Sequence, residues 1–188
     1  MGTTQQMMKQ PAAPDLAPET TTYLEMLDRG ELKPSAADRG GLVLTRLGPD
    51  QWQRGRQMYK DVGKDWLWID RLSWSEEKWR EYYGRPDIEL WVADSAGAPA
   101  GYFELSADGK GNTELAYFGL MPACIGKGLG GLLLTLAIER AWDAGARRVW
   151  VHTSSRDHAQ ALPNYLARGF RLYHTETKHT PTGNPAAS

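Results

Sequence analysis

Apolar residues recur at helical spacing in the third quarter of the chain. Leu132, Leu133 and Leu136 share one side of the pattern, and Thr135 and Glu139 lie on the other. The pattern predicts a long helix that begins near residue 129 and ends at a glycine at position 145.

Shorter stretches with alternating or continuous apolar residues predict strands, and polar turns containing glycine separate them. The expected strands are residues 42–47, 88–94, 100–107, 113–120, 148–153 and 170–175. Three further helices are expected over 49–63, 75–83 and 158–168. Turns join three consecutive strands as antiparallel neighbours before the long helix. The pattern therefore predicts an α/β layered domain with a mixed sheet.

The two ends of the chain differ in composition from its middle. Residues 1–22 are rich in proline, threonine and glutamine, which predicts a flexible leader. Residues 23–178 are expected to form a single domain, and residues 179–188 a frayed tail. A chain of 188 residues is long enough to bury one complete core.

Charge and composition exclude several partners. A formal net charge of −1 argues against nucleic acid, because proteins that bind the phosphate backbone usually have a basic surplus. No apolar stretch is long enough to span a membrane, and the single cysteine, Cys124, is typical of a reducing compartment. We expect a cytoplasmic protein with no membrane partner. The four histidines show no metal-site spacing, so no metal is expected.

Four glycines, Gly126, Gly128, Gly130 and Gly131, fall within six residues at the start of the long helix. Each weakens a helix by roughly 0.5–1 kcal/mol relative to alanine, so packing alone is a poor reason for them. Bare backbone at a helix N-terminus can bind an anion through free N–H groups and the helix dipole. The turn therefore predicts a phosphate site, with Lys127 as an additional partner.

Two nucleotide-binding patterns fit this turn less well. Gly126-x-Gly128-x-x-Gly131 matches the glycine fingerprint of dinucleotide-binding domains, but the next strand ends in His152 and Thr153 instead of an acidic residue for the ribose. The mononucleotide P-loop requires Lys and then Ser or Thr after the glycines, and this sequence has neither pair. Both mismatches favour another ligand with phosphate groups.

Two motifs stand in a fixed order around the long helix. A turn with proline and glycines precedes it, and a segment with tyrosine, glycine and phenylalanine follows the next strand. The motifs are Pro122-x-x-x-Gly126-x-Gly128-x-Gly130 and Ala161-x-x-x-Tyr165-x-x-x-Gly169-Phe170. In this order and spacing they resemble the GNAT superfamily of N-acetyltransferases, over about residues 42–175. The resemblance implies a mixed, mainly antiparallel central sheet flanked by helices.

The same resemblance implies an enzyme that transfers an acetyl group from acetyl coenzyme A to an amine of a small molecule by direct attack. It places the coenzyme on the glycine turn and along the strand before it, where Gly119 would permit a bulge and a splay from the neighbouring strand. The implied cofactor-binding residues are Phe118, Gly119, Leu120, Gly126, Lys127, Gly128, Leu129, Gly130 and Gly131.

The sequence departs from the family pattern at two positions. Ile125 stands where the family usually has Arg or Gln, so one pyrophosphate contact must come from elsewhere or from the backbone. Asn164 replaces the usual apolar residue before Tyr165. The second change alters local packing and leaves the tyrosine hydroxyl in place.

Transfer to an amine requires a proton acceptor and a proton donor. A glutamate inside an apolar strand is costly to bury and needs a reason. The resemblance places the base at Glu114, with Glu104 or ordered water as the alternatives, because a carboxylate can take the amine proton directly or through water. Tyr165 matches the tyrosine that protonates the departing thiolate.

Five tryptophans lie between residues 52 and 79, a region that covers the acceptor side of the cleft in the family. Trp66, Trp68 and Tyr117 are the candidate substrate-binding residues. Packing of two short helices on the sheet would also explain such side chains. Three alternatives to small-molecule acetylation stay open at this point: a non-catalytic acyl-coenzyme sensor, a partner-binding module, and acetylation of a protein lysine or N-terminus. A homodimer through the last strands is compatible with each.

Overall fold

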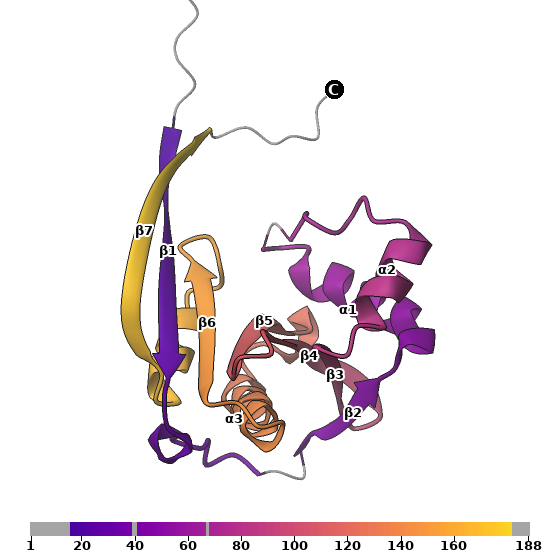
Figure 1. Cartoon of the computed structure of the whole chain (residues 1–188), viewed down its shortest axis with the longest axis horizontal. Coiled ribbons are helices and arrows are strands. Elements are labelled where there is room, and N and C mark those ends of the chain that lie inside the picture. Colours follow the sequence, from indigo (N-terminus) through magenta and orange to yellow (C-terminus); the bar gives the residue numbers. More distant parts are fainter. Residues whose placement is uncertain (1–15, 39–40, 67, 182–188) are drawn as a thin grey trace, which may run out of the picture.

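The chain folds around one seven-stranded mixed sheet. The computed structural model describes residues 16–38, 41–66 and 68–181. The strand order is β2-β3-β4-β5-β6-β1-β7, and every neighbouring pair is antiparallel except β5 and β6 (Figure 1). The bounds are β1 Leu16–Met26, β2 Val43–Leu47, β3 Ile88–Ser95, β4 Ala98–Ala107, β5 Asn112–Leu120, β6 Arg148–Ser154 and β7 Arg171–Pro181. The predicted mixed, mainly antiparallel sheet is confirmed.

Helices cover both faces of the sheet and enclose two apolar cores. The α-helices are α1 Trp52–Gly63, α2 Glu76–Tyr83, α3 Leu129–Asp143 and α4 Ala161–Ala167, and short 3-10 turns lie at Arg29–Glu31, Pro49–Gln51 and Pro122–Cys124. One core forms around α3, and the other lies between α1, α2 and the sheet. The predicted helices are present, although α4 begins at Ala161 and not at 158.

Thr135 lies on the buried side of α3, unlike the sequence expectation. Its hydroxyl donates a 2.8 Å hydrogen bond to the carbonyl of Gly131 one turn earlier and accepts one of 2.9 Å from the backbone N–H of Ser35. The polar side chain is therefore satisfied inside the core, which removes the cost of burying it.

β1 differs from the predicted flexible leader. Residues 16–22 of that leader belong to the strand, and residues 1–15 lie outside the described residues. β1 sits between β6 and β7, with Leu24 and Met26 fully buried. The two strands that pair with β1 lie more than a hundred positions later in the sequence. Local composition therefore gave no sign of the pairing.

β5 and β6 are paired only at their beginnings. The parallel ladder joins Asn112, Thr113 and Glu114 to residues 148–150, and β5 then continues beside β4 alone. Figure 1 shows the two strands diverging from that point. The sequence expected this strand to splay from a neighbour without saying which, and the structure shows the splay against β6. It leaves the β6-facing edge of β5 without a strand partner among the described residues.

The bulge in β5 lies at Ala116, whereas the sequence placed it at Gly119. Glu104 of β4 opposes Tyr117 and Leu105 opposes Leu115, so Ala116 is the extra residue. Gly119 has a different reason to be glycine, because a Cβ there would come within 2.4 Å of the Val62 side chain of α1. Close packing of α1 on β5, and not a bulge, explains that position.

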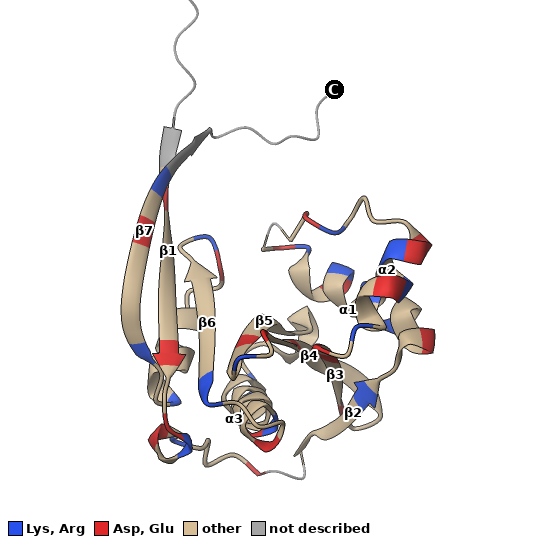
Figure 2. Cartoon of the chain, viewed as in Figure 1, with Lys and Arg blue, Asp and Glu red and all other residues tan. Residues whose placement is uncertain are grey.

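Charged residues of both signs are interspersed along the helices and the outer strands (Figure 2). This distribution matches the formal net charge of −1. None of the helices in the described parts of the chain is long and apolar enough to cross a membrane.

Candidate active site

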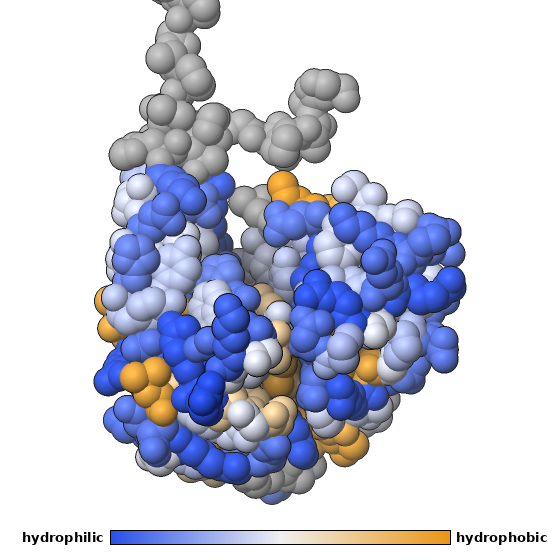
Figure 3. Space-filling model, viewed as in Figure 1, coloured by the Kyte–Doolittle hydropathy of each residue, from blue (hydrophilic) through white to orange (hydrophobic). Residues whose placement is uncertain are grey.

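A large cavity opens where β5 and β6 diverge. Its volume is about 1680 Å³, and its walls come from β5, the α1–α2 connection, the turn before α3, and the β6–α4 loop with α4. Figure 3 shows the surface hollowed between the side formed by β6, β1 and β7 and the side formed by α1 and α2. The fold thus places the end of the splay and the start of α3 in one space.

The glycine turn forms one end of this cavity. Gly126 and Gly128 have φ angles of +79° and +78°, a left-handed conformation that favours glycine, and no atom lies within 4 Å of an ideal Cβ on either. Gly128 precedes the first turn of α3, whose N–H groups have no partner within the helix. The backbone is therefore bare and open at a positively polarised helix end, as an anion requires.

Two of the predicted cofactor residues lie outside the cavity wall. Lys127 is exposed and Leu129 packs against the core around α3, whereas the remaining seven line the cavity. Ile125, which departs from the family pattern, also lines the cavity and is 37% exposed.

Asn164, the second departure, connects two helices at the cavity. Its side-chain amide donates a 3.2 Å hydrogen bond to the carbonyl of Gly130, so α4 is fastened to the first turn of α3. Gly131 permits a close approach nearby, because a Cβ there would meet Nη1 of Arg168 at 2.7 Å. The substitution by asparagine therefore adds a contact that an apolar residue would lack.

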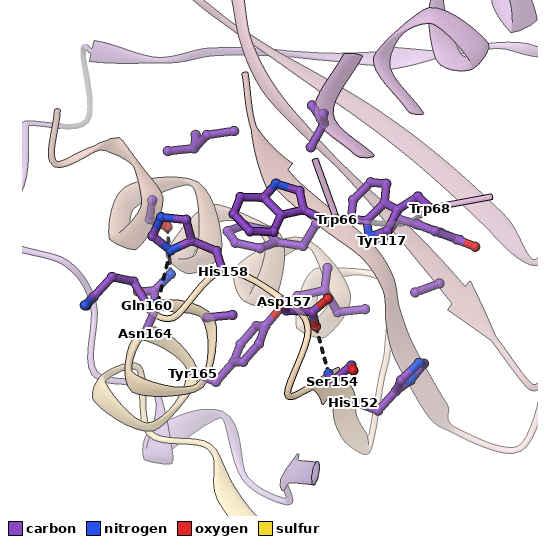
Figure 4. A pocket seen from close by; sticks show the side chains of 18 of the residues that line it. Trp66, Trp68, Tyr117, His152, Ser154, Asp157, His158, Gln160, Asn164 and Tyr165 are labelled. Atoms are coloured by element: carbon purple, nitrogen blue, oxygen red, sulfur yellow. Dashed lines mark hydrogen bonds between the residues drawn. The ribbon is translucent and has the colours of Figure 1, made fainter. Parts of the chain in front are cut away.

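Tyr165 of α4 is buried and lines the cavity. Its ring packs against Phe118 of β5 and Phe170, with centroids 6.2 and 6.0 Å away. Figure 4 shows the side chain pointing toward Asp157. Burial and then the negative charge of Asp157 raise the pKa of the Tyr165 hydroxyl well above its usual value. The phenol therefore holds its proton at neutral pH.

Glu114 and His152 face each other where the strands separate. Oε1 of Glu114 lies 3.2 Å from Nδ1 of His152, and both side chains line the cavity. The histidine side chain is 46% exposed and the glutamate 23%. The hydrogen bond to Glu114 raises the pKa of His152, and this effect exceeds the lowering by burial.

Glu104, the second candidate base, is held in a buried ion pair. Its two oxygens accept hydrogen bonds of 2.8 and 2.9 Å from Arg71 and one of 2.6 Å from the hydroxyl of Tyr82. The side chain is fully buried and does not line the cavity. All three hydrogen bonds stabilise the ionised carboxylate and hold it in one position. This argues against the predicted role of Glu104 in proton transfer.

Aromatic rings surround the guanidinium of Arg71. It lies 4.3 Å from the ring centres of both Tyr82 and Tyr117 and 4.9 Å from that of Trp74. Burial alone would lower the pKa of Arg71, but hydrogen bonds and attraction from Glu104 raise it overall. Trp74 and the two tyrosines therefore form an aromatic wall around this ion pair.

The three predicted substrate-binding residues all line the cavity. Trp68 packs edge-on against Tyr117 at 5.0 Å, and Trp66 meets His158 of the β6–α4 loop at 5.2 Å (Figure 4). The contact between Trp66 and His158 joins the two sides of the cavity.

Sequence reasoning missed several residues of this site. His152, Asp70, Asp157 and His158 line the cavity but were not among the candidates. Alternation in the strand from residue 148 to 153 places His152 on the face away from the buried Val149. This is the one sequence signal that pointed to His152 as a cavity residue. In the described residues no group of three or more His, Cys, Asp or Glu side chains could hold a metal ion.

Solved structures share this fold. A GCN5-related N-acetyltransferase from Kribbella flavida is 19% identical with a TM-score of 0.62, covering 89% of this chain and 60% of that one. A functionally unknown protein from Staphylococcus epidermidis is 15% identical with a TM-score of 0.57, covering 86% and 61%. The chain thus spans about three fifths of the length of these two structures.

An aminoglycoside acetyltransferase from an uncultured soil metagenomic sample, in complex with sisomicin, is 14% identical with a TM-score of 0.56 and covers 68% of this chain and 86% of that one. No curated protein matches the sequence. The model of the acetyltransferase (GNAT) family matches residues 55–170, which include the diverging strands, the glycine turn and the tyrosine helix described above. The chain belongs to the acetyltransferase (GNAT) family.

Proposed function

We propose that this protein is an N-acetyltransferase that moves an acetyl group from acetyl coenzyme A to an amine of a small molecule by direct attack. One observation supports this most strongly. The unpaired edge of β5, the open glycine turn, Tyr165 and the Glu114–His152 pair all face the same cavity. An anion site, a proton acceptor and a proton donor are the parts that such a transfer needs.

The cavity is the proposed site of acetyl coenzyme A, which would supply the activated acetyl group as a thioester. The backbone from Gly126 to Gly131 would hold the diphosphate, because the left-handed glycines leave room that a side chain would fill. The free edge of β5 from Leu115 to Leu120 would bind the extended arm, as an added strand binds a sheet edge. A backbone N–H in residues 118–120 would stabilise negative charge on the thioester carbonyl.

The Glu114–His152 pair is the proposed proton acceptor. An amine with a pKa of 10.4 is neutral in only about one molecule in 10³ at pH 7, at a cost of roughly 5 kcal/mol. With Nδ1–H of His152 donating to Glu114, Nε2 has a lone pair for the amine proton. The carboxylate orients the ring and stabilises the charged form that results, as it does in other base–carboxylate pairs.

Tyr165 is the proposed proton donor. A tyrosine hydroxyl carries its proton at neutral pH, and Tyr165 lines the cavity, so this group has a proton to give to the departing sulfur. The packing of the ring between Phe118 and Phe170 fixes its orientation.

Release of free coenzyme A from acetyl coenzyme A in the presence of an amine panel tests this function. We expect amine-dependent release, and calorimetric binding of coenzyme A in the micromolar range. Binding without release for any small amine would identify a sensor or a protein acetyltransferase. No binding at millimolar coenzyme A would refute the proposal.

A further inference from the structure

Asp70 places a negative charge on the acceptor side of the cavity. It belongs to the connection between α1 and α2, is exposed, and lines the cavity together with Trp68 and Tyr117. Among the described residues, its hydrogen-bond partner is the hydroxyl of Tyr117, which donates to Oδ2 over 3.4 Å. Among the residues that the structure describes, no Lys, Arg or His forms an ion pair with this carboxylate.

The other carboxylates of the cavity are engaged. Glu114 pairs with His152, and Glu19 lies 3.4 Å from Arg156. Asp157 accepts hydrogen bonds of 2.7 and 2.8 Å from the hydroxyl of residue 153 and the backbone N–H of residue 154. In the described parts of the chain, Asp70 differs from all three because neither a cation nor a pair of hydrogen-bond donors engages it.

Arg71, the next residue in the chain, also lines the cavity, but its charge is engaged by Glu104. The guanidinium of Arg71 points to Glu104, whose two oxygens take its Nη1 and Nη2 hydrogen bonds. That pair is neutral as a unit, so the charge that remains on this wall is the one on Asp70. The rings of Trp68 and Tyr117 beside it suit the stem of an amine and attract a cation to their faces.

We propose that the acceptor is a diamine whose second, positively charged nitrogen binds Asp70 while its first nitrogen is acetylated. The inference rests on the proposed function and names the substrate class of that site. Tyr117 orients the carboxylate through its hydroxyl, and its ring contacts the carbon chain between the two nitrogens.

The strand geometry sets the length of this diamine. Tyr117, which contacts Asp70, follows Glu114 by three positions on β5. Three residues span at most about 10 Å, and the bulge at Ala116 shortens this distance. We therefore expect the best acceptors to have about four to six carbon atoms between their nitrogens.

The experiment compares diamines with matched monoamines. For the full chain, kcat/KM is measured with 1,5-diaminopentane and with pentylamine, and the ratio of the two is the readout. We expect a ratio of about 2–5 in favour of the diamine, because one exposed, partly screened ion pair contributes up to about 1 kcal/mol. The ratio should fall as salt rises, since exposed charges are screened.

Asp70→Asn keeps the shape of the side chain and its contact with Tyr117 but removes the charge. The ratio should fall to about 1, through a higher KM for the diamine. Asp50→Asn, at an exposed aspartate outside the cavity, is the matched control and should leave the ratio unchanged. A ratio near 1 in the unaltered protein, or one that survives Asp70→Asn, overturns the inference while leaving the proposed function intact.

Calorimetric binding of the two amines separates the inference from turnover. If neither amine releases coenzyme A, the proposed small-molecule activity fails, and binding alone decides on the cation site. Tighter binding of the diamine that is lost in Asp70→Asn supports the site. Equal binding of the diamine and the monoamine would refute a cation site at Asp70.

Discussion

The buried pair between Arg71 and Glu104 gives the sharpest prediction about stability. Arg71→Met keeps a stem of similar length against the aromatic rings but removes both charge-assisted hydrogen bonds. Glu104 is fully buried, and among the described residues it would retain the hydroxyl of Tyr82 as its one donor. Leaving a buried carboxylate without its cation costs about 3–5 kcal/mol of the free energy of unfolding.

Thermal unfolding by circular dichroism measures this loss. For a chain of this size, 1 kcal/mol shifts Tm by about 2–4 °C, so the expected decrease is roughly 6–20 °C. Arg46→Met is the matched control, because Arg46 pairs with Glu89 at 3.1 Å but its side chain is 51% exposed. That exposed pair should contribute no more than about 1 kcal/mol.

A double variant tests the physical cause. Arg71→Met combined with Glu104→Leu removes both charges, so most of the lost stability should return, less about 1 kcal/mol for the Tyr82 hydroxyl that loses its acceptor. If Arg71→Met behaves like Arg46→Met, the carboxylate reaches water and the reasoning fails. Glu104 would then regain its place as a candidate base.

Three further predictions concern the site. The acidic limb of the kcat/KM profile should have its midpoint above the usual histidine pKa of about 6.5, because the raised pKa keeps the ring of His152 protonated to higher pH. Glu114→Gln should move that limb to lower pH. A limb that does not move would belong to another group. Tyr165→Phe should lower kcat by about 10²–10⁴ with little change in acetyl coenzyme A affinity, and an unchanged kcat would contradict its role as proton donor. Gly128→Ala should weaken coenzyme A binding in calorimetry. Gly97→Ala is the control at a similar φ of +80° in the β3–β4 turn, and it should cost a comparable stability of about 1–2 kcal/mol without changing coenzyme A binding. Equal effects of the two variants on binding would refute the glycine-turn site.

Local patterns predicted most of the elements because each signal lies within one stretch of sequence. The helical spacing of Leu132, Leu133 and Leu136 marked α3, and the positive φ angles of Gly126 and Gly128 agree with the turn that the glycines predicted. A splay of β5 from a neighbouring strand was also predicted, from the family resemblance and Gly119, but the sequence did not say that the neighbour is β6.

The features that sequence reasoning missed depend on distant partners. β1 is a strand because β6 and β7 pair with it, and its own composition resembles a leader. Glu104 and Arg71 are 33 positions apart, and nothing in the strand around Glu104 indicates that a guanidinium will neutralise it. A buried glutamate was expected to need a reason, and the structure gives an ion pair as that reason.

The bulge at Ala116 connects the fold to the site. In an unbroken strand, residues 115 and 117 would share a face, so Tyr117 would lie with Leu115 in the core around α3. The extra residue reverses this alternation and puts Tyr117 opposite Glu104, on the same face as Glu114, whose partner is Ser106. A bulge also bends its strand and increases the twist, and this one lies two residues beyond the last pair between β5 and β6. A single inserted residue therefore accounts both for the acceptor wall and for the departure of β5 from its neighbour, which is the step that opens the cavity.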